Sequence, residues 1–270
     1  YATGGWQKNN PLKPEYARYG SFDILRDNNE KRINELFSGM TQQKAEPGSV
    51  EQKISDLYKM GLDSVRLNAE GAAPVKDAVA GILAISDRSQ LTPVVARIHT
   101  AIANPFFSVG VQADLMNSDI NALYISQSGI MMGDRDYYLD PENENIRTAY
   151  KEYLGKLFRL GGVPEADIEK AVAGVMNIET KLAEKSWSNT ELRDIPAQYN
   201  PTAKAEFEKT YDAIDWPVYY KAMGIGDFDT IIVTTKSSIA NANDLMKNAP
   251  LEDIRYYLAA QYLDDAASYL

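Results

Sequence analysis

The chain has 270 residues, of which 44% are hydrophobic and 24% are charged, as is usual for a globular protein and unlike a disordered or fibrous one. Its 38 acidic residues outnumber its 28 basic ones, and the formal net charge of −10 argues against nucleic acid or an anionic membrane surface as a partner, because both are bound through clustered Lys and Arg. It has no cysteine and one histidine, His99, so it lacks the donors of a catalytic zinc site, which normally takes three protein ligands.

The N-terminal part of the chain predicts two helices separated by a polar loop. The first covers residues 22–37, with Ser21 as its cap. The polar stretch 41–49 is expected to be an exposed loop, and S-V-E-Q from Ser49 has the pattern of a capping box that begins the second helix. The apolar positions of the first helix that fall on one side are Phe22, Leu25, Ile33, Leu36 and Phe37.

Two further helices are expected before the pattern changes. One covers residues 72–86, and the next begins with Thr92 as its cap and Pro93 in its first turn. Between residues 104 and 129 the apolar residues Phe107, Val109 and Val111 alternate with smaller or polar ones, and M-N-S-D supplies a turn before N-A-L-Y-I-S-Q-S. We therefore predict a β-hairpin packed on helices, and a second short strand over residues 230–235.

The clearest helix covers residues 164–186 and starts at Pro164. Its apolar positions repeat at spacings of three and four residues: Ile168, Val172, Val175, Ile178 and Leu182. Three later helices are expected over residues 203–212, 236–248 and 251–269. The predicted fold class is therefore mainly α with a small β-hairpin.

His99 lies in V-V-A-R-I-H-T-A-I, on a helix whose other faces are apolar. One interpretation is a lone acid/base group, and the other is a half-buried histidine with one hydrogen bond. We favour the second, because a perturbed histidine needs partners that the sequence does not place.

The stretch GDRDYYLDPENE, residues 133–144, contains closely spaced carboxylates. An EF-hand calcium loop needs Asp, Asn or Ser at the fifth position and glycine at the sixth, where this chain has Tyr138 and Leu139. A structural turn in which Arg135 pairs with an Asp is the favoured interpretation.

Several enzyme classes have no support in the sequence. It has no G-x-S-x-G, no G-x-x-x-x-G-K-[ST] and no G-x-G-x-x-G, the motifs of nucleophile-elbow hydrolases, P-loop enzymes and dinucleotide-binding proteins. Glycosidase chemistry by paired carboxylates stays open, since 38 acidic residues permit many pairs. An unrecognised carboxylate hydrolase would be active without metal.

Two arginines eight positions apart, Arg18 and Arg26, stand out in A-R-Y-G-S-F-D-I-L-R-D. A planar guanidinium suits bidentate capture of a carboxylate, so an arginine just before a helix can hold the C-terminus of a peptide. The alternative is a solvated Arg18, with Arg26 paired to Asp23 or Glu30 on its own helix. Residue chemistry alone favours the alternative.

Four longer stretches, read together, resemble the N-terminal half of the neprilysin family of zinc metallopeptidases. They are YATGGWQKNNPLKPEYARYGSFDILRD, ISQSGIMMGDRDYYLD, WSNTELRDIPAQYNPTA and APLEDIRYYLAAQYL. The family includes neprilysin, endothelin-converting enzyme and the bacterial oligopeptidase O, and the resemblance covers essentially the whole chain. The chain departs from it at Thr3, where the animal proteins have cysteine, and at Gly133, where the family usually has proline. The cysteine-free chain fits a bacterial member.

The resemblance implies a helical lid lobe that faces a thermolysin-like catalytic lobe across a cavity. Residues 1–15 would connect the lobes, 16–187 would form the lid, and 188–270 would begin the catalytic lobe, without its zinc site. The H-E-x-x-H segment of the family is absent from this sequence and would lie beyond residue 270. By the same resemblance, Arg18 and Arg26 are the candidate substrate-binding residues; neither catalytic nor metal-binding residues are expected within the 270.

The function that this resemblance implies is that of the non-catalytic N-terminal region of a zinc metalloendopeptidase. It would cover the active-site cavity and limit substrates to short peptides, with the C-terminal catalytic half of the same protein as its partner. Taken alone, the 270 residues are expected to bind no zinc and to be inactive. The implied location is extracytoplasmic: periplasmic, at the cell surface or secreted. The alternative is a free-standing helical module that binds a peptide or a glycan.

Overall fold

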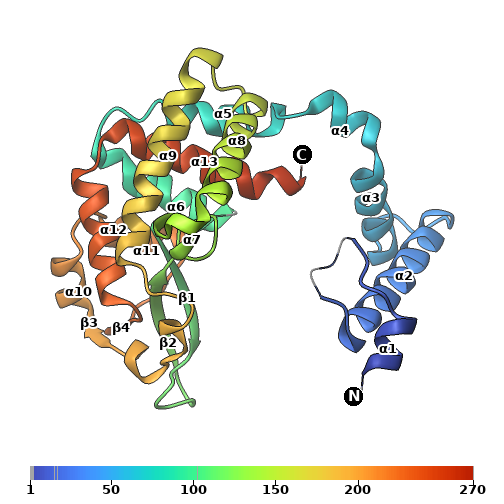
Figure 1. Ribbon diagram of the computed structural model, residues 1–270, viewed down its shortest axis with the longest axis horizontal. Helices are drawn as coiled ribbons and strands as arrows, with labels where there is room; N and C mark the ends of the chain where they lie inside the picture. The colour runs from blue at the N-terminus through green and yellow to red at the C-terminus, as the bar shows by residue number, and fades with distance from the viewer. Residues whose placement is uncertain (1–2, 15, 17, 102, 270) are drawn as a thin grey trace. The chain divides into compact units, whose positions relative to one another are not determined.

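The computed structural model describes residues 3–14, 16, 18–101 and 103–269. Contacts within the chain divide it into two compact units, residues 1–69 and residues 70–270, which we call unit 1 and unit 2 and describe separately. Figure 1 shows that unit 1 is built from helices, whereas unit 2 also contains a small sheet.

Unit 1 is centred on a pair of helices. These are α2 (Ser21–Thr41) and α3 (Val50–Leu62), which pack together through Phe37 and Tyr58, whose rings meet edge to face with centroids 5.8 Å apart. A short helix α1 (Gly4–Asn9) precedes them, and α4 (Ser64–Glu70) ends at the boundary with unit 2. The mostly exposed loop 42–49 between α2 and α3 is as predicted.

The caps of the two helices agree with the sequence only in part. Ser21 was predicted to cap α2 and does not: Gly20 is the cap residue, and its amide donates a 2.8 Å hydrogen bond to the Asp23 carboxylate. The Ser49 prediction is confirmed, since its hydroxyl accepts from the Gln52 amide at 3.1 Å. The Gln52 side chain accepts a hydrogen bond from the amide of Gly48, whereas in a capping box it would accept from the amide of Ser49.

Unit 2 contains the remaining helices and the hydrophobic core. Helix α13 packs against α5, α8 and α9, as Figure 1 shows, and is buried along most of its length. The bounds are α5 (Ala73–Leu83), α6 (Leu91–Ala101), α7 (Asp136–Leu139), α8 (Glu144–Leu160), α9 (Glu165–Lys185), α10 (Lys204–Thr210), α11 (Trp216–Met223), α12 (Lys236–Asn248) and α13 (Leu251–Ala266).

All the helices predicted in this unit are present to within a few residues, whereas α7, α8 and α11 were not predicted. The predicted cap of α6 is wrong. This helix starts at Leu91, directly after a 3₁₀ turn that Asp87 caps through the Ser89 amide at 2.9 Å. Thr92 lies inside the helix, and its hydroxyl accepts a 3.0 Å hydrogen bond from the amide of Asp215.

The sheet has four strands in the order β1-β2-β4-β3. The predicted hairpin is confirmed: β1 (Phe107–Ala113) and β2 (Asn121–Gln127) are antiparallel, with Phe107 opposite Gln127. The predicted short strand is β4 (Thr230–Val233), which pairs in parallel with β2. Strand β3 (Pro201–Ala203) was not predicted and closes the other edge.

The fold is mainly α with a small sheet, as the sequence predicts. The pairing of β2 with β4 and the packing of α9 against α13 join segments on both sides of residue 187. The lobe boundary expected there therefore falls inside unit 2, and the expected lobes at 1–15, 16–187 and 188–270 stay a prediction.

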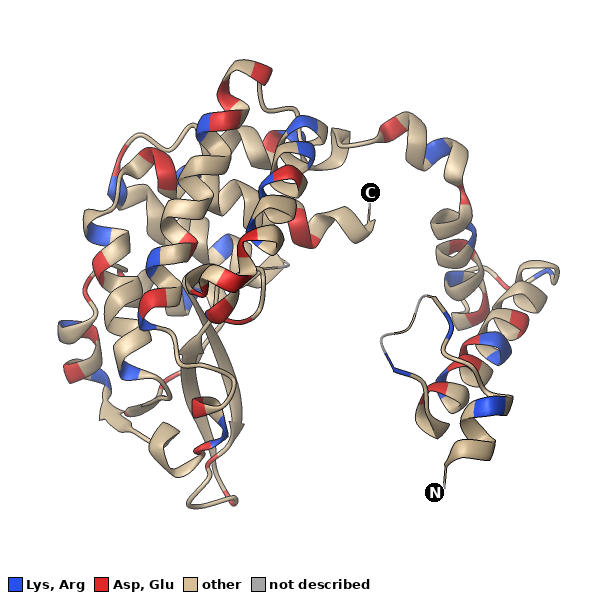
Figure 2. Cartoon of the chain, in the orientation of Figure 1, with Lys and Arg blue, Asp and Glu red and all other residues tan. Residues whose placement is uncertain are grey.

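Charges of both signs are mixed along the helices of each unit, as Figure 2 shows. Among the described helices, none is both long and apolar enough to span a membrane.

Candidate functional site

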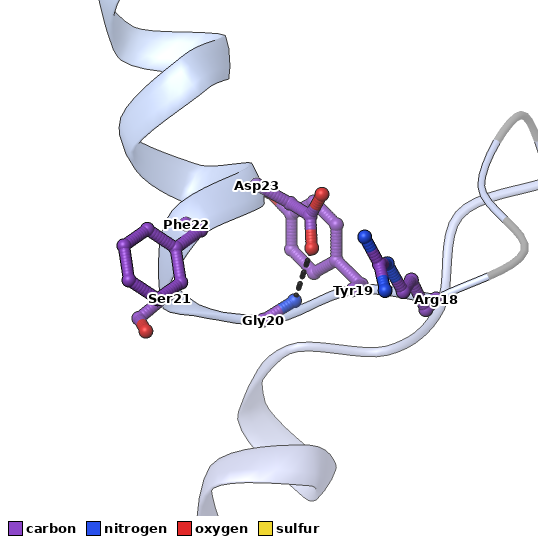
Figure 3. A pocket seen from close by; sticks show the side chains of 6 residues that line it. All are labelled: Arg18, Tyr19, Gly20, Ser21, Phe22 and Asp23. Carbon is purple, nitrogen blue, oxygen red and sulfur yellow. Dashed lines mark hydrogen bonds between the residues drawn. The ribbon is translucent and has the colours of Figure 1, made fainter. Parts of the chain in front are cut away.

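The candidate site in unit 1 is the segment that leads into α2. Arg18, Tyr19, Gly20, Ser21, Phe22 and Asp23 line a depression of about 360 Å³, drawn in Figure 3. Arg18 is exposed, and within the described part of the chain its guanidinium has no hydrogen-bond or ion-pair partner. Its planar donors are therefore available to an anionic group such as a carboxylate.

The backbone of this segment is held at its junction with the helix. Gly20 is extended, with φ −147° and ψ −172°, and its amide is bound by Asp23 (Figure 3). The Asp23 carboxylate lies in the first turn of α2, where the partial positive charge of the helix N-terminus stabilises it. The turn that carries Arg18 is thus fixed from its C-terminal side.

Asp27, on α2, also fixes this segment. Its carboxylate accepts hydrogen bonds from the ammonium of Lys13 at 2.7 Å, from the hydroxyl of Tyr19 at 3.0 Å and from that of Tyr16. The Lys13 hydrogen bond, followed by that of Tyr16, holds the pKa of Asp27 well below its ordinary value. Three residues on both sides of Arg18 are therefore tied to one carboxylate on α2.

Arg26 has a different environment from Arg18. Its guanidinium lies 3.5 Å from Asp23 and 3.8 Å from Glu30, and it stacks over the ring of Tyr16, 5.1 Å from the centroid. Tyr16, followed by the two carboxylates, raises the pKa of Arg26. The pairing with Asp23 and Glu30 that the sequence favours is confirmed, and substrate binding by Arg18 and Arg26 stays a prediction.

The acidic stretch 133–144, predicted to be a turn, contains helix α7 and a 3₁₀ helix over residues 141–143, and its carboxylates cap backbone amides. Asp134 accepts from the Asp136 amide at 3.0 Å. The predicted pairing of Arg135 with an Asp is wrong: Arg135 donates to the carbonyl of Ser186 at 2.8 Å and lies 4.0 Å from Glu191. Among the residues that the structure describes, no group of three His, Cys, Asp or Glu could hold a metal ion.

His99 has a structural role, as the sequence favours, although it makes two hydrogen bonds instead of one. Nε2 lies 3.1 Å from the carbonyl of Pro105, which only accepts, so Nε2 carries the proton. Nδ1 then accepts from the Tyr219 hydroxyl at 2.6 Å. Burial lowers the pKa of His99 to about 4, so the ring is neutral at pH 7.

A second titratable group, which the sequence interpretation missed, is buried in unit 2. The carboxyl of Glu179, on α9, is fully buried and accepts from the hydroxyls of Tyr138 and Tyr150, each at 2.8 Å. Burial raises its pKa to about 8. Because its partners are core residues of the chain itself, it joins α7, α8 and α9 and is not open to a ligand.

Comparison with known proteins gives one consistent relationship. The sequence model described as peptidase family M13 matches residues 1–270. Endothelin-converting enzyme 1 of Rattus norvegicus is 29% identical over 285 residues, covering all of this chain and 37% of its own length. Endothelin-converting enzyme-like 1 of Mus musculus is 22% identical and is covered over 35% of its length.

Solved structures share the fold. The zinc metalloprotease ZMP1 of Mycobacterium tuberculosis, in complex with an inhibitor, superposes with a TM-score of 0.90 at 24% identity, over 99% of this chain and 41% of that chain. PEPO of Lactobacillus superposes with a TM-score of 0.74 at 18% identity, over 97% of this chain and 41% of that chain. The 270 residues thus span well under half the length of these relatives.

Proposed function

This chain belongs to peptidase family M13, the neprilysin family, and from that premise we propose that it is the non-catalytic N-terminal region of a zinc metalloendopeptidase. The observation that carries the proposal is the match of all 270 residues to the family, combined with a coverage of 37% of the length of endothelin-converting enzyme 1. In this proposal the catalytic half of the same protein is its partner and short peptides are its substrates.

Zinc belongs to the proposed full-length protein and does not fit the residues present here. With one histidine and no cysteine, the chain lacks the nitrogen and sulfur donors of a peptidase zinc site. His99 itself is committed to Tyr219 and Pro105. We therefore assign zinc to residues outside these 270 and derive no chemical step from it.

The proposed role of the region is to cover the active-site cavity and limit the size of substrates. Residues 16–187 would form the lid, 1–15 the connection between lobes and 188–270 the start of the catalytic lobe. An extracytoplasmic location is part of the same proposal and rests on the family resemblance. Fractionation of cells that express the natural gene tests it, and recovery in the cytoplasm would contradict it.

Of the two arginines, Arg18 is the better candidate for contact with a substrate. Its guanidinium is exposed at the depression before α2, whereas Arg26 is surrounded by Asp23, Glu30 and the ring of Tyr16. A carboxylate that binds Arg26 would have to displace these acidic neighbours, and one that binds Arg18 would not. We propose that Arg18 binds the C-terminal carboxylate of a peptide and that Arg26 supports the same segment.

The test compares the 270-residue chain with the protein encoded by its complete gene. We expect a downstream H-E-x-x-H, stoichiometric zinc and peptide cleavage in the longer protein, and neither zinc nor cleavage in the 270 residues. Zinc-dependent cleavage by the 270-residue chain would overturn the proposal. A stop codon directly after residue 270 would also overturn it and would favour the free-standing binding module.

A further inference from the structure

Unit 1 has no hydrophobic core of its own. Between residues 3 and 69, its only buried residue among those described is Ser55. Every described apolar residue that is buried lies in unit 2, from Val75 onward. A segment of this size becomes stable by removing apolar surface from water, so unit 1 needs a cover from outside itself.

The apolar residues of unit 1 lie at its surface. Although unit 1 is about a quarter of the chain, it holds ten of the twenty large apolar side chains that are exposed among the described residues. Side chains scattered singly would need no explanation, but a group of them on one helix pair favours an interaction surface, and we call this group the apolar patch. The exposed members on α2 and α3 are Phe22, Leu25, Ile33, Leu36, Val50, Leu57, Met60 and Leu62.

Part of this patch is hollowed into an apolar groove between α2 and α3. Phe37 comes from α2, and Ile54, Leu57, Tyr58, Gly61 and Leu62 come from α3, around a volume of about 360 Å³. Gly61 has no atom within 4 Å of where a side chain would begin, so the groove is open above it. Leu57 and Leu62, at its rim, are 71% and 64% exposed. The groove fits apolar side chains of a packed partner.

We propose that this groove and the adjoining apolar face of α2 are the docking surface for the part of the full-length protein outside these 270 residues. The inference rests on the proposed function, in which the chain is one region of a longer enzyme. More than half the length of each curated relative lies outside the match, which supplies an occupant of sufficient size. The surface is therefore internal to the complete protein.

A second copy of the chain is a weaker explanation of the same surface. A unit without a core needs its cover whenever the protein is folded, at any protein concentration. A cover on the same polypeptide meets this requirement, because its effective concentration is fixed by the connecting chain. The occupant is accordingly intramolecular.

The test uses the absence of cysteine from the chain. Leu57→Cys places a thiol at the groove, and Leu160→Cys, on α8 in unit 2, is the matched control, because Leu160 is 75% exposed and also on a helix. Maleimide labelling is measured for both variants in the 270-residue chain and in the longer protein, with the labelled peptide assigned by mass spectrometry. We expect equal rates in the 270-residue chain, and in the longer protein labelling about tenfold slower at residue 57 alone.

Equal labelling at the two positions in the longer protein would overturn the inference. Protection of residue 57 in the 270-residue chain would also overturn it. Protection that rises with protein concentration would indicate a second copy as the occupant, and protection independent of concentration would indicate unit 2. Zinc content of the longer protein separates this from the proposed function. If residue 57 is protected in a longer protein that contains no zinc, the docking surface is supported and the proposed function is not. If the longer protein contains zinc and residue 57 is not protected, only the proposed function is supported.

Discussion

The hydroxyl of Tyr138, on α7, donates a 2.8 Å hydrogen bond to the carboxyl of Glu179, on α9, in a fully buried position. Tyr150 makes an equal bond to the same oxygen, and Gln261 lies 3.4 Å from the other. Burial disfavours the charged carboxylate more than these hydrogen bonds favour it, so the pKa of Glu179 rises to about 8 from an ordinary 4.5. Folding therefore favours the protonated acid.

Glu179→Gln should remove a pH dependence from the stability of unit 2. A group whose pKa is higher in the folded state stabilises fully below its unfolded value and loses that contribution as pH rises through the folded value. The free energy of unfolding of the natural chain should thus fall relative to that of the variant between about pH 4.5 and pH 8, by on the order of 4 kcal/mol. Urea unfolding across this range measures the difference.

The matched control is Glu169→Gln, on the exposed face of the same helix. Its stability should follow that of the natural chain at every pH. Parallel curves for the natural chain and Glu179→Gln would show that Glu179 stays charged in the folded protein.

Local pattern predicted much of this fold. The repeat from Ile168 to Leu182 gave α9, the alternation after Phe107 gave the hairpin, and Ser49 marked the start of α3, because each depends on near neighbours in sequence. Helix α8 was missed although Tyr150, Leu154, Leu157 and Phe158 have helical spacing. The parallel pairing of β2 with β4 joins residues about a hundred positions apart and has no local signal.

Asp27→Asn should loosen the segment that carries Arg18. The neutral amide loses the charge-assisted bond to Lys13 and accepts more weakly from Tyr16 and Tyr19. Amide hydrogen exchange at residues 16 and 18–20 should become severalfold faster, while the core helices of unit 2 are unchanged. Glu35→Gln, an exposed change on the same helix, is the control and should leave exchange as it is. Unchanged exchange in Asp27→Asn would show that Asp27 does not hold the segment.

The candidate site was only partly predictable. The resemblance selected Arg18, and helical spacing predicted the pairs of Arg26 with Asp23 and Glu30. Asp27 was missed because its partners, Lys13 and Tyr16, lie in a loop whose path the sequence does not define. The sequence did indicate that Glu179 is buried, because it stands beside Ile178 and four residues after Val175 on the buried face of α9. Its tyrosine partners are 29 and 41 positions away.

Arg18→Ala, made in the longer protein, should raise KM for peptides that end shortly after the cleaved bond. Loss of a charge-assisted hydrogen bond to the terminal carboxylate would raise KM about tenfold. The same peptides with an amidated C-terminus should be cleaved equally by the variant and the natural enzyme. Arg26→Ala is the comparison and should have a smaller effect, because its guanidinium already has acidic neighbours. Equal losses on free and amidated peptides would contradict carboxylate binding by Arg18.

Gly129→Ala should be far more destabilising than Gly133→Ala, although both glycines have left-handed backbones, with φ of +91° and +82°. A methyl group on Gly133 meets no atom within 4 Å, so that change should cost only the backbone strain, about 1 kcal/mol. The same φ excludes proline at residue 133, because the proline ring fixes φ near −65°.

At Gly129 the added carbon would lie 2.1 Å from the Tyr257 hydroxyl and 2.6 Å from the amide of Phe106. That hydroxyl donates to the Gly129 carbonyl and accepts from the Phe106 amide, both at 2.9 Å, so the clash breaks two buried hydrogen bonds. We expect a loss of about 4 kcal/mol in urea unfolding. Equal losses for the two variants would mean that strain alone matters and that Tyr257 can move aside. Tyr257→Phe combined with Gly129→Ala separates the two contacts, because removing the hydroxyl relieves the contact with Tyr257 and leaves the contact with the Phe106 amide.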